Sequence, residues 1–302
     1  MAETFTFLPK RRLGIAFHIF MTAIIMAGCA TLTWLAFQQT GGTLLVVDLL
    51  GSVFLFLLLP FVGYRGFALI KGIYSLKRDG LRIRWGLRAE DIPLSEVVWV
   101  RPATDLEVPL SLPALSVPGA MLGYVEHPDL GPVEFIASSS RNLVIVATIN
   151  KIYALSPERK DEFVQRFQRA LEMGTLTPME AYSSIPAAFV RQIALDKVGR
   201  TLIPAGLGLT LSLLVIVGLS VSSRSMVSIG YDPQGNLLPP VASMRLLLLP
   251  VLAVLLYIAG TVAGVYFYRK PDTRPVSWLV WSGSLITPVL LIIAASILLN
   301  AA

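Results

Sequence analysis

The stretch Leu81-Arg82-Ile83-Arg84-Trp85 alternates apolar and basic side chains with a period of two. Successive side chains of a β-strand point to opposite faces of its sheet, so this pattern predicts a strand with one apolar and one basic face. The turn Arg78-Asp79-Gly80 precedes the stretch, and Asp-Gly is a favoured hairpin turn. The sequence therefore predicts an antiparallel sheet in the middle of the chain.

This strand belongs to residues 71–171, the one long polar interval of the chain. Short β-branched and apolar runs predict further strands at residues 92–94, 97–100, 133–137, 142–148 and 152–155. A helix is expected to close the interval, with Ser156 as its N-cap and Pro157 at its first position. Its apolar stripe consists of Phe163, Val164, Phe167 and Leu171. Several strands followed by one helix predict a small α+β unit.

The rest of the chain is too apolar for an ordinary soluble protein. Hydrophobic residues make up 55% of the 302 residues and charged residues only 15%. Uncharged runs of about twenty residues recur, which is the length that crosses a bilayer as a helix. The expected transmembrane helices are residues 13–37, 43–70, 201–221, 246–267 and 276–299. The predicted fold class is a multi-pass α-helical membrane protein with five transmembrane helices and an inserted α+β domain.

The first apolar run has an alternative interpretation. It follows Lys10-Arg11-Arg12, and a basic start before an apolar stretch is also typical of a cleaved signal peptide. Met26-Ala27-Gly28-Cys29 is similar to the small-residue box that precedes a lipoprotein cysteine. The chain stays apolar over residues 30–35, where a lipoprotein would become polar. We therefore expect a transmembrane helix here. Because Cys29 is the single cysteine, no disulfide framework is expected.

The expected domains are an N-terminal segment with a two-helix hairpin (1–70), the polar domain (71–175), a basic linker (176–200) and a three-helix module (201–302). Sixteen of the 25 Lys and Arg residues lie in residues 71–200. With the N-terminus inside, only Arg224 and Arg245 fall in the outer loops. Inner loops carry an excess of Lys and Arg. We expect the inner (cytoplasmic) membrane, with the N-terminus and polar domain cytoplasmic and the C-terminus outside.

Parts of the polar domain resemble a known family. Tyr74-Ser75-Leu76, Asp79-Gly80-Leu81-Arg82-Ile83 and Ile92-Pro93-Leu94-Ser95-Glu96-Val97 resemble the opening of bacterial pleckstrin-homology-like (PH-like) domains. Gly131-Pro132-Val133-Glu134-Phe135 through Tyr153-Ala154-Leu155-Ser156-Pro157 resembles the close of the same domain. The resemblance covers residues 70–172. It implies a seven-stranded, partly open barrel or sandwich with a C-terminal helix, and no established catalytic activity.

Three basic residues are candidates for lipid or anion binding. Lys77, Arg82 and Arg84 are similar to the Lys and Arg-x-Arg group that binds inositol phosphates in eukaryotic PH domains. The spacing from Lys77 to Arg82 is short for that pattern. The alternative is a solvated basic strand face beside an anionic leaflet, where each cation contributes on the order of 1 kcal/mol. We favour the solvated face.

His18 lies inside the first apolar run, and a histidine within a membrane helix is a candidate functional residue. It is expected either to bond a neighbouring carbonyl or to ligate a porphyrin or chlorophyll. The chain has only two histidines and no paired ligand, so no cofactor is expected. His127, in a Pro-rich loop, is expected at the surface. Glu90 and Asp91 are adjacent, so they are not expected to face one site.

No nucleotide loop, Ser/His/Asp set or metal-ligand motif is present in the sequence, so we predict no enzyme and no metal site. The leading prediction is a non-catalytic membrane protein whose PH-like domain is a protein-binding, assembly or membrane-surface platform. Its expected partners are membrane lipids and other membrane proteins or a second copy, and not nucleic acid. The alternative is an accessory subunit of a respiratory or photosynthetic complex, with His18 contacting a pigment, haem or quinone. A transporter using Asp48 is a third hypothesis.

Overall fold

The computed structural model describes residues 4–39, 43–174, 179–184, 186–224, 226–228, 230, 232–235 and 238–301. The chain forms two compact units. The first comprises Met1–Met26 and Leu57–Pro186, and the second comprises Ala27–Phe56 and Ala187–Ala302. The division passes through the first two long helices, so each unit contains part of both.

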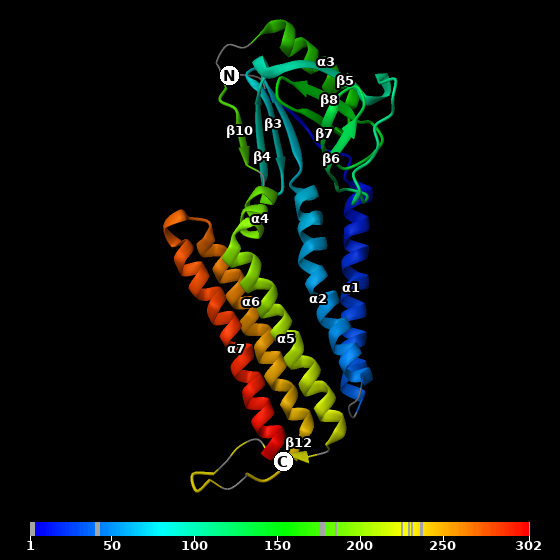
Figure 1. Cartoon of the computed structure of the whole chain (residues 1–302). Coiled ribbons are helices and arrows are strands. Elements are labelled where there is room, and N and C mark those ends of the chain that lie inside the picture. Colours follow the sequence, from blue (N-terminus) through cyan, green and yellow to red (C-terminus); the bar gives the residue numbers. More distant parts are fainter. Residues whose placement is uncertain are drawn as a thin grey trace. The chain divides into compact units, whose positions relative to one another are not determined.

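The first unit contains two five-stranded sheets. The first of them, the β1–β10 sheet, has the strand order β1-β2-β3-β4-β10, and its strands pair antiparallel (Figure 1). Its strands are β1 (Phe5–Phe7), β2 (Ile73–Lys77), β3 (Gly80–Trp85), β4 (Arg88–Pro93) and β10 (Tyr182–Ser184). Leu81, Ile83 and Trp85 on β3 are almost completely buried. The predicted alternation of this strand is confirmed.

The second sheet, the β5–β6 sheet, has the order β5-β8-β9-β7-β6. Its strands are β5 (Val97–Pro102), β6 (Met121–His127), β7 (Gly131–Ala137), β8 (Val144–Thr148) and β9 (Ile152–Leu155). β7 pairs with β9 in parallel, and the other neighbours pair antiparallel. Residues 72–155 thus contain eight strands where the resemblance implies seven, and the β6–β7 hairpin pairs with one side of β9.

The inner faces of the two sheets enclose one core. Buried side chains from both sheets belong to it, among them Tyr74, Trp85, Ile136 and Val146. The hydroxyl of Tyr74 donates a hydrogen bond of 2.7 Å to the carbonyl of Ile136, which links the two sheets directly. Burying aromatic and branched side chains between two sheets is the main source of stability in such a sandwich.

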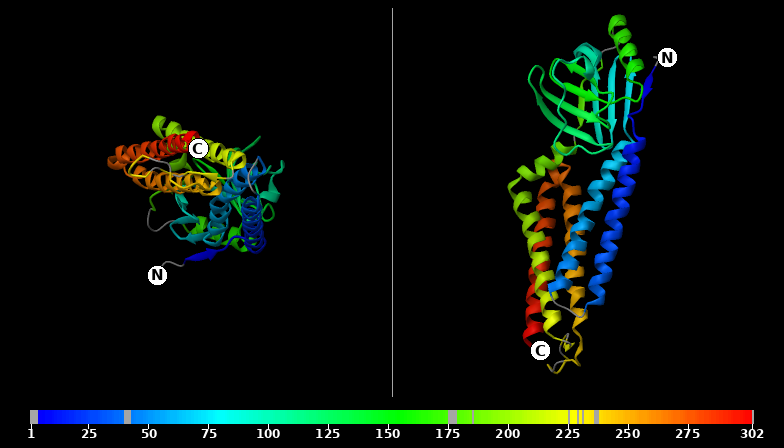
Figure 2. Two further views of the ribbon diagram at one scale, coloured as in Figure 1. Left: turned by 90° about the horizontal axis from the view of Figure 1, so that it is seen from below. Right: turned by 90° about the vertical axis from the view of Figure 1, so that its right-hand side faces the viewer.

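The closing helix is α3 (Lys160–Met173), which lies across one end of the sandwich (Figure 2). Its predicted apolar stripe is confirmed, because Phe163 and Phe167 are fully buried in the core. The predicted N-cap is wrong: the helix begins at Lys160, and Ser156 is not its cap. The Ser156 hydroxyl instead accepts a hydrogen bond of 2.7 Å from the N–H of Ser138, at the ends of β9 and β7.

Two edge strands lie outside the polar interval that the sequence singled out. β1 comes from the segment before the first long helix, and β10 comes from the region expected to be a basic linker. Residues 175–178 of the expected domain end and linker lie outside the described residues. β1 covers the free edge of β2 and β10 covers that of β4. β1 and β10 become the edges of the sheet, and such short edge strands offer little backbone for pairing with another chain.

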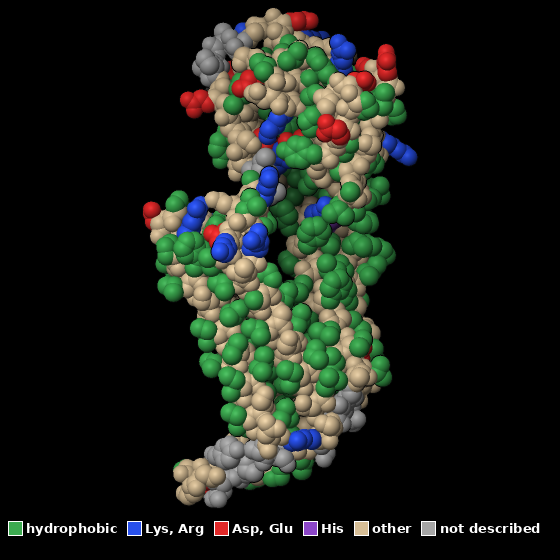
Figure 3. All heavy atoms as spheres, viewed as in Figure 1, with side chains coloured by type: hydrophobic (Ala, Val, Ile, Leu, Met, Phe, Trp, Pro, Cys, Tyr) green, Lys and Arg blue, Asp and Glu red, His purple; other side chains and the backbone are tan. Residues whose placement is uncertain are grey.

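Five helices are long and apolar enough to cross a membrane, among the residues that the structure describes. They are α1 (Arg12–Gln38), α2 (Thr43–Ile70), α5 (Lys197–Ser223), α6 (Leu248–Tyr268) with the short turn before it, and α7 (Arg274–Ala301) with the short turn before it. The predicted apolar segments are therefore confirmed as helices. Their exposed faces carry apolar side chains, whereas charged side chains gather on the sheets and near helix ends (Figure 3).

Within the first unit, the ends of α1 and α2 join the sandwich directly. Ala68 and Leu69 at the end of α2 are buried in the same core as the strands. Gly14 on α1 approaches Gly119 so closely that a Cβ built on Gly14 would lie 2.4 Å from the Gly119 Cα. Arg11 donates a hydrogen bond of 3.1 Å to the carbonyl of Ile70. The sandwich and these helix ends form one packed body.

In the second unit, α5, α6 and α7 pack on one another, and α4 (Pro186–Leu195) precedes them. Asp196 caps α5, because its carboxylate accepts hydrogen bonds from the N–H groups of Val198 and Gly199. The hydroxyl of Tyr268, at the end of α6, donates a 2.8 Å hydrogen bond to the other oxygen of the same carboxylate. One side chain therefore fixes the start of α5 and ties it to α6.

Candidate binding site between the two sheets

The structure brings the three predicted anion-binding residues to one face of the β1–β10 sheet. Arg82 lies opposite Ser75 and Arg84 lies opposite Ile73, so both share a face with Lys77 on β2. Lys77 and Arg84 are at opposite ends of this strand pair, roughly 13 Å apart along the strand at about 3.3 Å per residue. The three cations are therefore spread along the hairpin and do not surround a single point.

Both arginines have an acidic neighbour on β4. Nη1 of Arg84 lies 2.5 Å from Oδ1 of Asp91, and Nε of Arg82 lies 3.7 Å from Oδ2 of the same carboxylate. Their side chains are 37% and 38% exposed, so each pair contributes little to stability. Asp91 nevertheless offsets part of the positive charge of this face. Binding of a lipid or anion by Lys77, Arg82 and Arg84 stays a prediction.

His18 lies on α1 within the first unit and is only 4% exposed. Its Nδ1 lies 2.7 Å from the carbonyl oxygen of Gly14, which is one of the two arrangements that we expected. A carbonyl only accepts hydrogen bonds, so Nδ1 carries the proton and Nε2 carries the lone pair. Nε2 is buried and has no hydrogen bond among the described residues. His18 also lines an apolar cavity of about 500 Å³, between α1 and α2.

The expectation that His127 lies at the surface is wrong. This residue is 3% exposed, at the end of β6. Its Nε2 lies 3.0 Å from the carbonyl oxygen of Val108, and its Nδ1 accepts a hydrogen bond from the N–H of Asp129. The Pro-rich segment folds over the outer face of the β5–β6 sheet, where Leu110 packs on Phe135 and its neighbours. His127 ties this segment to the sheet.

A buried charge cluster connects the two sheets. Nη2 of Arg88, on β4, lies 2.8 Å from Oε1 of Glu90 and 2.7 Å from Oε1 of Glu134, on β7. The two carboxylates are almost completely buried. Nζ of Lys151, which is more exposed, lies 3.8 Å from Oε2 of Glu134. Buried charges are costly unless they are paired, so each member depends on the others.

The cluster shifts the ionisation of its neighbours. Burial alone would lower the pKa of the Arg88 guanidinium, but the charges of Glu134 and Glu90 and their hydrogen bonds raise it. Burial, together with the negative charges of Glu90 and Glu134, raises the pKa of Tyr153 well above its ordinary value. Partial burial and the hydrogen bond and charge of Glu134 raise the pKa of Tyr124 to about 12. Both tyrosines therefore stay neutral at physiological pH.

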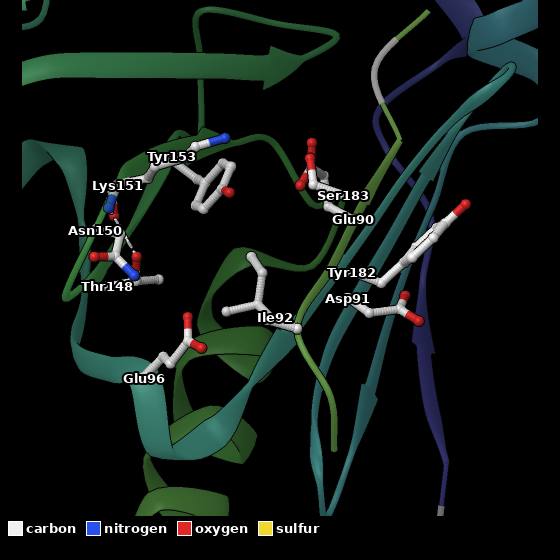
Figure 4. Close-up of a pocket in the computed structure, with 11 residues that line it drawn as sticks. Glu90, Asp91, Ile92, Glu96, Thr148, Asn150, Lys151, Tyr153, Tyr182 and Ser183 are labelled. Atoms are coloured by element: carbon white, nitrogen blue, oxygen red, sulfur yellow. Dashed lines mark hydrogen bonds between the residues drawn. The ribbon is translucent and has the colours of Figure 1, made fainter. Parts of the chain in front are cut away.

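A cleft of about 160 Å³ opens beside this cluster (Figure 4). Its walls come from β4 and the turn after it, the β8–β9 turn, and β10. The lining residues are Glu90, Asp91, Ile92, Glu96, Thr148, Asn150, Lys151, Tyr153, Ala181, Tyr182 and Ser183. In Figure 4 the carboxylate of Glu90 and the hydroxyl of Tyr153 point toward one another, whereas Asp91 and Tyr182 point away from them. The side chains of Glu90 and Asp91 face opposite sides of the sheet, yet both residues line this cleft, which the sequence did not lead us to expect.

Our sequence reasoning missed this cleft. Glu90 alternates with the apolar Ile92 on the inner face of β4, and Glu134 stands between Val133 and Phe135. A charged residue at an inward position of a strand was the available signal. What the pattern does not reveal is that the two carboxylates meet across two sheets. Among the described residues, no group of three His, Cys, Asp or Glu side chains is placed to hold a metal ion.

Comparison with known proteins agrees with this fold. Residues 72–171 match the family model described as the bacterial PH domain. The chain contains a bacterial PH domain. The match coincides with the range of the resemblance seen in the sequence and ends within α3. No curated protein and no solved structure matches the chain. The PH domain of this chain includes β1 and β10, both of which lie outside the matched residues.

Proposed function

We propose that this chain is an integral membrane protein without catalytic activity, whose PH domain serves as a platform for binding and assembling other proteins at the cytoplasmic surface. The observation that carries the proposal is the shared core of the PH domain and the ends of α1 and α2. A domain on a flexible tether would sample many orientations. This domain is packed onto the helices that we propose to be membrane-embedded, so its binding surfaces have a fixed orientation to them.

Several contacts between the helix ends and the PH domain support this fixed attachment. Nη1 of Arg65 on α2 donates a hydrogen bond of 3.2 Å to the carbonyl of Leu115. The N–H of Leu87, in the β3–β4 turn, lies 3.4 Å from the hydroxyl of Tyr64. α2 also ends at Ile70, shortly before β2 begins. These contacts come from separate loops, so they restrain tilting of the domain as well as its distance from the helices.

The occupied surfaces indicate where a partner has room to bind. The helices α1 and α2 hold one end of the PH domain, and α3 covers the other end (Figure 1). β1 and β10 form the two edges of their sheet. The cleft beside Glu90 and the outer face with Lys77, Arg82 and Arg84 remain open to solvent, at least in part. We propose that a partner binds at the cleft side.

Site-specific photo-crosslinking in native membranes tests the platform. We would place the crosslinking amino acid at Tyr182, which is 55% exposed beside the cleft, and as a control at Tyr266, which is 66% exposed on α6. The expected result is a discrete crosslinked protein, or a dimer of the chain, from position 182 and not from position 266. A purified species that is strictly monomeric and gives no crosslink at position 182 would contradict the proposal.

We propose the orientation of the chain in the membrane from the distribution of Lys and Arg residues, and this orientation needs its own test. In a Cys29→Ser background, single cysteines at Ser139, in the β7–β8 turn, and at Gln234 would be labelled with a membrane-impermeant maleimide. Gln234 is exposed and Ser139 is partly exposed. We expect labelling at position 234 in intact cells, and at position 139 only after the membrane is opened. Labelling of position 139 in intact cells would reverse the orientation.

The environment of His18 supports a second candidate function, an accessory subunit of a larger respiratory or photosynthetic complex. Its Nε2 is buried and has no hydrogen bond among the described residues, and the residue lines the apolar cavity between α1 and α2. A pigment, haem or quinone contact would use that nitrogen. The test is the visible absorption spectrum of the chain purified from its native membrane. A band lost in His18→Leu supports this function, and a spectrum without any band removes the pigment and haem forms of it.

A further inference from the structure

Two polar side-chain atoms that face the cleft of the PH domain have no hydrogen-bond partner among the described residues. Glu90 is 2% exposed, and both of its hydrogen bonds from Arg88 go to Oε1, so Oε2 has none among the described residues. Tyr153 is 4% exposed, and its hydroxyl has no hydrogen bond within that part of the chain. Both atoms are accessible from the cleft, so their hydrogen-bonding capacity is available to a ligand. Because these two point toward one another across the cleft, they indicate a bound group between them (Figure 4).

The charges around the cleft select a cation. Of the charged residues that line the cleft, Glu90, Asp91 and Glu96 are acidic and only Lys151 is basic, so acidic side chains are in excess at its walls. A carboxylate oxygen only accepts hydrogen bonds, and a phenol oxygen accepts as well as donates. A ligand with several N–H donors and one positive charge satisfies both oxygens and offsets part of the excess negative charge. An anion would meet the excess negative charge.

The size of the cleft limits the ligand further. Its volume is about 160 Å³, and a water molecule takes about 30 Å³ of liquid, so the cleft has room for about five waters. That room suits the end of one long side chain or a small amine, and it is too small for a nucleotide. We propose that this cleft binds one ammonium or guanidinium group, held by Glu90 Oε2 and the Tyr153 hydroxyl, with Glu96 at the wall.

The group has two possible sources, a lysine or arginine side chain of a partner protein and a free amine. The inference depends on the platform function only for the first source. In both cases the ligand touches β10, because Tyr182 and Ser183 form one wall of the cleft. β10 pairs with β4 through three residues and is followed closely by α4, which begins at Pro186. A bound cation would therefore stabilise the pairing of β10 with β4.

Isothermal titration calorimetry on the full chain in detergent tests the site, with methylguanidinium and methylammonium as probes and sodium as the reference cation. We expect saturable binding of the two organic cations. Tyr153→Phe and Glu96→Gln should each weaken it about tenfold or more, since a hydrogen bond to a charged group is worth that much. Matched controls are Tyr266→Phe and Glu172→Gln, which make the same chemical changes away from the cleft and should bind as the natural chain does. Neither test variant removes a bond that holds the fold.

The outcomes distinguish a partner side chain from a free amine, and they distinguish the cation site from the platform function. Displacement of methylguanidinium by arginine-containing peptides supports a partner side chain, and binding of small amines without peptide competition supports a free amine. Three results would overturn the inference. They are no saturable binding by the folded chain, an equal affinity for methylguanidinium in Tyr153→Phe, and binding of inorganic phosphate at Lys151. Failure of the crosslinking experiment would remove the platform function and leave the amine titration intact.

Discussion

Glu90 and Glu134 share one nitrogen of a single arginine: Nη2 of Arg88 lies 2.8 Å from one carboxylate and 2.7 Å from the other. The two acids come from different sheets, so this nitrogen joins the halves of the PH domain. Without the cation, two negative charges would face each other in a buried place. We therefore expect the arginine to be a structural requirement of the sandwich.

Replacing Arg88 by Met should destabilise the PH domain strongly. The substitution keeps an apolar stem but leaves two buried carboxylates without their main cation, which typically costs about 3–5 kcal/mol. Thermal and denaturant unfolding of the purified chain measures the loss. Arg141→Met in the exposed β7–β8 turn is the control and should change stability by less than about 0.5 kcal/mol. Equal stability of the two variants would mean that the buried acids are held by other groups.

Alkaline pH should destabilise the domain through its tyrosines. The fold raises the pKa of Tyr124 from an ordinary 10.0 to about 12. The unfolded chain therefore loses this proton first, so the stabilising contribution is complete below pH 10 and disappears as the pH rises toward about 12. Unfolding measured over this range, with the phenolate absorbance as a second signal, should show a steeper loss for the natural chain than for Tyr124→Phe. If the stability of both chains fell equally with rising pH, the raised pKa of Tyr124 would be contradicted.

Asp91→Asn should strengthen binding of the chain to anionic vesicles. The carboxylate now faces both Arg82 and Arg84, and its removal leaves their charges uncompensated on the open face of the sheet. We expect an increase of a few-fold, corresponding to about 1 kcal/mol per cation near an anionic surface, and the increase should disappear at high salt. Asp161→Asn on α3 is the matched control. An unchanged affinity would show that this face does not approach the membrane surface.

Gly119→Ala should loosen the attachment of the PH domain to the helices. Gly119 has φ of +87°, and a Cβ built there would lie 2.6 Å from a Leu69 methyl and 2.7 Å from the Gly14 Cα. The unfavourable backbone and the overlap should together cost about 1–3 kcal/mol. Limited proteolysis should be faster and the unfolding temperature lower in this variant than in the natural chain. Gly63→Ala, where no atom lies within 4 Å of the new Cβ, should be neutral or slightly stabilising.

The sequence predicts those helices and strands whose apolar residues recur at a regular spacing. Leu81, Ile83 and Trp85 follow the two-residue period of a strand, and Phe163 and Phe167 follow the helical period of α3, so their burial was expected. The long apolar helices follow from length and composition alone. β1 and β10 have three residues each, which is too short for any period to be recognised.

The candidate site was harder to predict because it depends on contacts between distant residues. Arg82 and Arg84 were recognised from their local spacing, but Asp91 reaches them only through the register of β3 and β4. Glu90 and Glu134 are far apart in the sequence and meet only when the two sheets pack. Ser156 shows the same limit, since its role as a cap was a local expectation and its actual partner is Ser138.

The position of β1 has a consequence for synthesis of the chain. Phe5, Thr6 and Phe7 leave the ribosome before α1 and α2, yet their partners on β2 follow both helices. The strand must therefore wait, with its backbone unpaired, until both helices and β2 have been made. Completion of the sheet thus depends on α1 and α2 forming and bringing β2 back beside β1. A chain that fails this step keeps an open strand edge, which is a feature that quality-control proteases and chaperones recognise.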